Sequence, residues 1–294
     1  MSTLSNNVRG ILWILASVPC FQAMNVMLRN MAADLHPIEV MFLRNLFGFV
    51  VLLPFLLRGA HVLRTKRIGT NIVRSAAHFT GMALWVYALT LVPLATANAL
   101  LFSSPLFVAI GALAFLGERA DIGRWCALLA GFAGVMIIYQ PGSGSVSIGG
   151  GVVLLCAVLL AISKLLTKRV VQTDSTLSAI FYLNVFTCLC ALGPAIAVWE
   201  WPTGEQYGWF AALGVVGGIA HFCMTRAVAL ADLTMLQPFE FTALLWAAVI
   251  GFVLYAEIPS ASVFLGGISI IAAATYIAQR ESSQAKEVAK RAKR

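Results

Sequence analysis

Residues 94–118 read LATANALLFSSPLFVAIGALAFLGE, and residues 233–257 read LTMLQPFEFTALLWAAVIGFVLYAE. Each stretch is apolar and long enough to cross a bilayer, which takes about 20 residues of helix. With an offset of 139 residues (233 − 94), Phe102 falls on Phe241 and Glu118 on Glu257. At the same offset Asn98 falls on Gln237, so an amide occupies both positions. These matches predict that the chain contains one structural unit twice.

A second group of matches has nearly the same offset. With an offset of 140 (150 − 10), Gly10 falls on Gly150, Arg29 on Arg169 and Asp34 on Asp174. Matched leucines mean little in so apolar a chain, but matched charges mean more. We therefore predict three regions, listed by residue number: a first repeat over 1–145, a second over 146–279, and a basic tail over 280–294.

The composition places most of the chain in lipid. It is 60% hydrophobic and 11% charged, with a mean hydropathy of +0.89, whereas soluble domains carry about 25% charged residues. Ten stretches can span a membrane as helices, at 10–28, 38–57, 72–91, 95–116, 122–139, 148–167, 177–198, 207–228, 234–255 and 262–278. Five spans per repeat is an odd number, so the second repeat enters the membrane from the opposite side. The predicted fold is all-α, with ten transmembrane helices in two inverted five-helix repeats.

The positive charges predict the orientation. Cytoplasmic loops are enriched in lysine and arginine, and with both termini in the cytoplasm all of the 20 basic residues except Arg29, Arg44 and Lys164 lie in inner loops or tails. The net charge of +8 does not indicate nucleic-acid binding, because the charges lie at span ends and do not alternate with aromatics on one face. The six cysteines lie in apolar stretches and are interpreted as packing residues.

Three segments resemble the EamA-type branch of the drug/metabolite transporter superfamily. They are the entry to the second span, with Pro37 and Phe42-x-Arg44, the 93–118 segment, and the YAE sequence at 255–257. The resemblance implies a ten-helix transporter in which the first, third, fourth, sixth, eighth and ninth spans line a central cavity. Members of this branch export amino acids and related metabolites, and others carry nucleotide-derived or vitamin-like solutes.

Polar, aromatic and methionine side chains on those spans are the candidate substrate-binding residues, because buried polar groups in membranes are costly and often functional. The candidates are His78, Met82, Trp85, Asn98, Phe102, Lys164, His221, Gln237, Glu240 and Phe241.

Each polar candidate also has a structural interpretation. His78 and His221 could bind substrate or carry a proton, or could form a hydrogen bond between helices. Glu240 could neutralise a substrate amine or couple a proton, or could form a buried pair with Lys164. Lys164 could instead bind a carboxylate, or extend to the cytoplasmic interface. Asn98 and Gln237 suit a site on the pseudo-two-fold axis, but also suit plain helix–helix contacts.

Arg44 lies on the second span, which the resemblance places outside the cavity lining. We expect it to have a structural role. In the first span, Ser17, Phe21 and Met24 lie on one helix face, for which core packing is the default interpretation.

We therefore expect a secondary transporter that works by alternating access in the bacterial inner membrane. Aromatic residues and methionines at the predicted cavity favour export of amino acids with apolar or aromatic side chains. An alternative is another amphipathic or cationic solute, such as a nucleoside-like or vitamin-like compound or a quaternary amine. A membrane enzyme is a further alternative, but neither an HExxH nor a GxSxG motif occurs. We expect no metal or other cofactor, and a proton is a candidate coupling ion.

Overall fold

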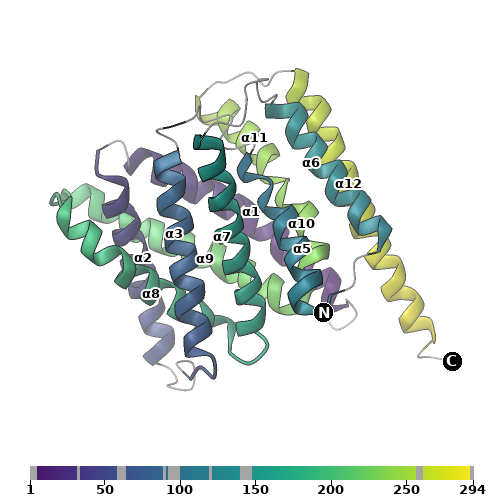
Figure 1. Cartoon of the computed structure of the whole chain (residues 1–294), viewed down its shortest axis with the longest axis horizontal. Helices are drawn as coiled ribbons and strands as arrows, with labels where there is room; N and C mark the ends of the chain where they lie inside the picture. The colour runs from purple at the N-terminus through teal and green to yellow at the C-terminus, as the bar shows by residue number, and fades with distance from the viewer. Residues whose placement is uncertain are drawn as a thin grey trace.

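The computed structural model describes residues 5–31, 34–57, 64–88, 91, 100–118, 121–139, 148–255 and 261–291. The regular elements within these ranges are all α-helices (Figure 1). They are α1 (Asn6–Met31), α2 (Pro37–Leu57), α3 (Ile68–Ala88), α5 (Ser104–Leu116), α6 (Ile122–Tyr139), α7 (Ile148–Val170), α8 (Thr176–Ala197), α9 (Gly204–Leu230), α10 (Leu233–Glu240), α11 (Ala243–Tyr255) and α12 (Ala261–Arg291).

The helices have the length and composition of membrane spans. Among the described residues, six helical segments are long and apolar enough to cross a bilayer, and three shorter ones are also apolar. Large apolar side chains are exposed on the surface of the bundle, as with Phe115, Val253 and Ile268, where lipid can cover them. The prediction of an all-helical integral membrane protein is confirmed, and each of the ten predicted spans overlaps a described helix.

The helices pack in pairs that join the first half of the chain to the second. α1 packs on α9, α3 on α7, α2 on α8 and α6 on α12. The α6–α12 pair lies along one side of the bundle, and α2 and α8 lie at the other (Figure 1). Exchanging α1, α2, α3 and α6 for α7, α8, α9 and α12 reproduces the same pairs. We propose on this basis that 1–145 and 146–279 are equivalent repeats.

Glycines allow close approach at two helix contacts, one between α6 and α12 and the other between α9 and α2. A Cβ atom at Gly134 of α6 would lie 2.7 Å from the carbonyl oxygen of Gly266 in α12. A Cβ atom at Gly214 of α9 would lie 2.8 Å from the backbone of Phe47 in α2. Such distances exclude a side chain, so both interfaces depend on backbone-to-backbone packing.

Two predicted spans are interrupted in the middle. The predicted 234–255 span is divided into α10 and α11 by a turn at Phe241 and Thr242, and a turn at Phe102 and Ser103 precedes α5. The hydroxyl of Thr242 donates to the Phe239 carbonyl at 2.5 Å, and that of Ser103 donates to the Leu100 carbonyl at 2.6 Å. The two turns occupy matched positions in the two halves. Discontinuous helices of this kind commonly surround transporter binding sites.

The beginning of α1 and the end of α12 lie at the same end of the bundle (Figure 1). We call this the basic end, because Lys66, Arg67, Arg124, Lys168 and Arg169 gather at the helix ends there, and we propose that it faces the cytoplasm. The region predicted as a polar tail is helical to Arg291, as a continuation of α12 past the body of the protein.

Candidate functional site

The turn between α10 and α11 lies beside the turn that precedes α5. The rings of Phe102 and Phe241 have their centroids 6.3 Å apart. Phe241 is fully buried, whereas Phe102 is partly exposed. The two matched aromatic candidates are therefore in contact, one from each half of the chain.

An ion pair occupies the end of α10 next to this aromatic contact. The Lys164 ammonium, on α7, donates to both carboxylate oxygens of Glu240, the last residue of α10. Each side chain is 18% exposed. Lys164 thus does not extend to the interface. Of the interpretations given for Glu240, the structure contains the buried pair with Lys164. The Lys164 cation also interacts favourably with the partial negative charge at the C-terminal end of α10.

A second polar group joins α2, α3 and α9. The Arg44 guanidinium lies 3.0 Å from Nε2 of His221. The ring of His78 is 6.4 Å from that of His221, and the ring of Phe21 is 5.1 Å from it, edge to face. Because a guanidinium only donates hydrogen bonds, Nε2 must accept here, and the proton of a neutral ring is on Nδ1. The sequence analysis listed both histidines as candidates but did not predict the contact of Arg44 with His221.

The remaining candidates are more dispersed. Trp85 packs with Ala88 and Val153 at the contact of α3 with α7, and Met82 is partly buried on α3. Gln237 is fully buried and donates to the Leu233 carbonyl of its own helix at 3.1 Å. Asn98 lies outside the described residues, so its predicted match with Gln237 stays a prediction.

Gln22 is a polar residue of this region that sequence reasoning missed. Its amide on α1 donates to the Ala243 carbonyl, the first residue of α11, at 2.8 Å. That bond connects α1 to the helix interruption. A glutamine within an apolar span was the signal that could have identified it.

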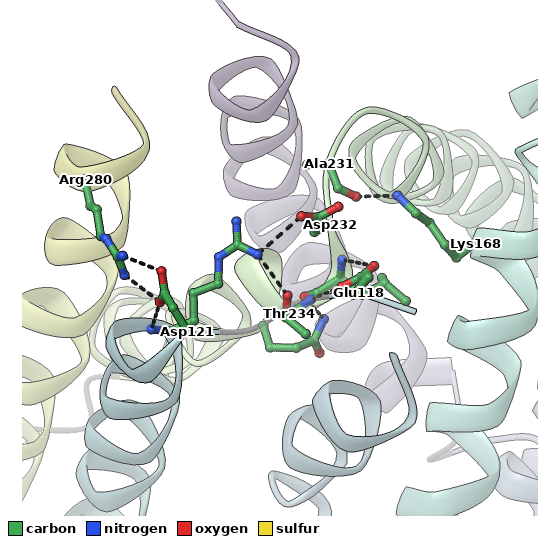
Figure 2. Close-up of polar contacts among 10 residues, drawn as sticks. Glu118, Asp121, Lys168, Ala231, Asp232, Thr234 and Arg280 are labelled. Carbon is green, nitrogen blue, oxygen red and sulfur yellow. Dashed lines mark hydrogen bonds and ion pairs between the residues drawn. The ribbon is translucent and has the colours of Figure 1, made fainter. Parts of the chain in front are cut away.

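At the basic end, a network of charged side chains fixes the start of α10 (Figure 2). The Glu118 carboxylate accepts hydrogen bonds from the backbone amides of Leu233 at 2.9 Å and Thr234 at 3.0 Å. Gly117, with a φ of 67°, ends α5 and turns the chain so that Glu118 can reach them. A carboxylate at a helix N-terminus accepts hydrogen bonds from the free backbone amides and interacts favourably with the partial positive charge there. Glu118 therefore caps α10 from the other half of the chain.

Further ion pairs surround this cap. Arg124 of α6 lies 3.2 Å from the Asp232 carboxylate, and Arg280 of α12 pairs with Asp121 (Figure 2). The hydrogen bond from Arg280 lowers the pKa of Asp121 below its ordinary value. The Lys168 ammonium donates to the Ala231 carbonyl at 2.6 Å and caps the end of α9. The Arg124–Asp232 and Asp121–Arg280 pairs connect the first half of the chain to later residues at the basic end.

Within the described part of the chain, no group of three or more histidine, cysteine or acidic side chains could hold a metal ion.

Comparison with known proteins gives the family. Residues 8–140 match the model of the EamA-like transporter family. The chain is 31% identical over 279 residues to the S-adenosylmethionine uptake transporter of Rickettsia felis, covering 95% of each chain. This protein belongs to the EamA-like transporter family. It is therefore a membrane transporter of small metabolites and not an enzyme, and its bacterial relatives place it in the inner membrane.

Other family members have different named substrates. The riboflavin transporter of Rhizobium johnstonii is 31% identical over 281 residues, covering 94% of this chain and 93% of that one. The pseudopaline exporter CntI of Pseudomonas aeruginosa is 26% identical over 266 residues, covering 90% and 94%. A solved crystal structure at 19% identity matches the fold with a TM-score of 0.80, over 94% of this chain and 98% of that one.

Proposed function

We propose that this EamA-like transporter takes up S-adenosylmethionine. S-adenosylmethionine is a nucleoside-like cation, which was the alternative substrate class expected from the sequence. It replaces the first expectation, export of amino acids with apolar or aromatic side chains. It is supported by the Rickettsia felis relative, which is named for that substrate and aligns over nearly the whole of both chains. The names of the relatives as a group fit the nucleoside-like and vitamin-like solutes better than free amino acids.

The Lys164–Glu240 pair carries the proposal. S-adenosylmethionine ends in an α-ammonium and an α-carboxylate, so it presents both charges that this pair needs. If the substrate separates the two side chains, its carboxylate replaces Glu240 beside Lys164, and its ammonium replaces Lys164 beside Glu240. No charge is then left without a partner, which in a low-dielectric site would be strongly unfavourable. Riboflavin has no such pair of charges, so the pair favours S-adenosylmethionine over riboflavin.

The aromatic residues beside this pair suit the rest of the molecule. Phe102 is partly exposed, and its ring contacts the ring of Phe241, the residue that follows Glu240 in the sequence. Stacking of a base on an aromatic side chain contributes about 1–3 kcal/mol, and a sulfonium can be attracted to a ring face as other cations are. We propose that Phe102 contacts the adenine or the sulfonium.

Transport by alternating access requires the halves to move relative to one another. In this structure Glu118, Asp121 and Arg124 contact Leu233, Arg280 and Asp232 at the basic end. We propose that these contacts separate when the site opens toward the cytoplasm. Proton coupling is a separate prediction, which the dependence of uptake on an imposed pH gradient would test.

The test is uptake of radiolabelled S-adenosylmethionine by the purified protein in liposomes. We expect saturable uptake that S-adenosylhomocysteine inhibits strongly, because it retains the amino-acid end. Phenylalanine carries the same two charges but no adenosyl group, so it should inhibit less than S-adenosylhomocysteine, and riboflavin, which lacks both charges, should inhibit weakly. Uptake no greater than in protein-free liposomes would overturn the proposal. Strong inhibition by riboflavin would favour a vitamin transporter, and strong inhibition by phenylalanine would restore the amino-acid interpretation.

A further inference from the structure

A small pocket lies between α2, α8 and α9, away from the Lys164–Glu240 pair. Three polar side chains line it, Arg44 from α2, Asn184 from α8 and His221 from α9, together with glycines of α2 and α9. The resemblance to the family does not place α2 or α8 at the substrate cavity. The pocket has room for about one particle the size of a water molecule. It is therefore too small for a nucleoside but not for a monatomic ion or one carboxylate oxygen.

The positive charge in this pocket has no counter-charge among the residues that the structure describes. Arg44 is 8% exposed, and among the described residues it makes a hydrogen bond to His221 but no ion pair. The acidic residue nearest to it on α2, Glu39, is fully buried and accepts instead from the backbone amide of Glu200 at 3.1 Å. A guanidinium carries five N–H donors, so one bond to His221 leaves most of them free for another acceptor.

Asn184 supplies a second unused donor. Its side chain is 5% exposed and makes no hydrogen bond to any residue that the structure describes. Gly48 of α2 allows Asn184 to lie close, because a Cβ atom there would be 3.3 Å from the Asn184 amide nitrogen. A buried amide without a partner is unfavourable, and this one lines the same pocket as the unpaired guanidinium.

We propose that this pocket binds a small anion, either chloride or a small carboxylate such as formate. The anion accepts hydrogen bonds from Arg44 and Asn184 and neutralises the guanidinium. An arginine inside a bilayer is stabilised by such a partner, since an unpaired charge there is costly. His221 bounds the pocket on one side and contacts Phe21 and His78 on the other.

Thermal unfolding of the purified full-length protein in detergent tests for chloride. The midpoint is compared in sodium chloride, sodium bromide and sodium gluconate at one ionic strength. We expect chloride and bromide to raise the midpoint of the wild type by about 3 °C or more over gluconate. Arg44→Gln and Asn184→Ala should each abolish that rise. Asn45→Ala is the matched control, because the Asn45 amide is buried on α2 but donates to the Met41 carbonyl of its own helix; its chloride response should equal that of the wild type.

The second arm identifies a carboxylate. Sodium formate should raise the midpoint over gluconate, whose chain is too large for this pocket, and Arg44→Gln should remove the rise, if a carboxylate supplies the anion. If neither the halides nor formate give a rise that depends on Arg44 and Asn184, the pocket binds no anion. Because the halide arm needs no transport substrate, a failure of the proposed function leaves it intact.

Discussion

The ammonium of Lys164 on α7 contacts both carboxylate oxygens of Glu240, the residue at which α10 ends. Both side chains belong to the second half of the chain and lie next to the contact of Phe102 with Phe241, which joins the halves. The interior of this transporter therefore contains a balanced pair of charges at a helix interruption. A solute that carries both charges can replace that pair.

Removing one member of the pair should destabilise the protein more than removing both. Lys164→Gln leaves the Glu240 carboxylate without its partner, which should cost about 3 kcal/mol, at the low end for a buried pair because the side chains are not fully buried. The double variant Lys164→Gln/Glu240→Gln should recover most of this loss. Unfolding midpoints in detergent measure both effects. Equal losses in the single and double variants would contradict a charge pair.

Phe102→Ala should weaken substrate binding without unfolding the protein, because Phe102 is partly exposed. If its ring stacks on adenine, the KM for S-adenosylmethionine uptake should rise about 10-fold. Phe102→Tyr, which keeps an aromatic face, should stay within about twofold of the wild type. An unchanged KM in Phe102→Ala would show that this ring does not contact the substrate.

The cap on α10 gives a third prediction. Glu118→Ala removes both hydrogen bonds to the amides of Leu233 and Thr234 and should lower stability by about 1–2 kcal/mol. Glu118→Gln can still accept from these amides but loses the charge, so its loss should be smaller. If the midpoints of the two variants equalled that of the wild type, Glu118 would contribute nothing to the start of α10.

The Asp121–Arg280 pair predicts a dependence of stability on pH. The hydrogen bond from Arg280 lowers the pKa of Asp121 below the ordinary 3.8. The pair therefore stabilises the folded protein fully above that value, and the contribution is lost as pH falls through the lowered pKa. Because both side chains are partly exposed, the contribution should be below about 1 kcal/mol. The wild type should be slightly more stable than Asp121→Asn at neutral pH, and the difference should vanish in acid. A difference that does not decline as the pH falls below 3.8 and through the lowered pKa of Asp121 would contradict this account.

The sequence was sufficient to predict the helices, because apolar runs of bilayer length and the distribution of lysine and arginine depend only on local composition. The offset that matches Phe102 with Phe241 predicted a repeated unit, but both stretches were expected to be continuous spans, and the structure has a turn at each of these positions. The offset could not predict that the helices stop at these residues, since the nearest proline, Pro105, lies after the first turn and Pro238 lies before the second.

The side-chain partners at the site depended on packing that the sequence does not contain. Lys164 and Glu240 come from helices whose contact is set by the whole bundle, so their pairing was one of several open interpretations. Arg44 was expected to be structural because α2 does not line the family cavity. Its bond to His221 exists because Gly214 lets α9 lie directly on α2.

The most direct test of the Lys164–Glu240 site is the preference for S-adenosylmethionine over 5′-methylthioadenosine, which lacks the amino-acid end. Initial uptake of both solutes is measured in liposomes that contain the wild type, Lys164→Gln/Glu240→Gln, or the control Arg169→Gln, which removes an exposed cation from the same helix. We predict that the preference falls at least 10-fold in the double variant and is unchanged in the control. A double variant that keeps the wild-type preference would contradict recognition of the substrate by this ion pair.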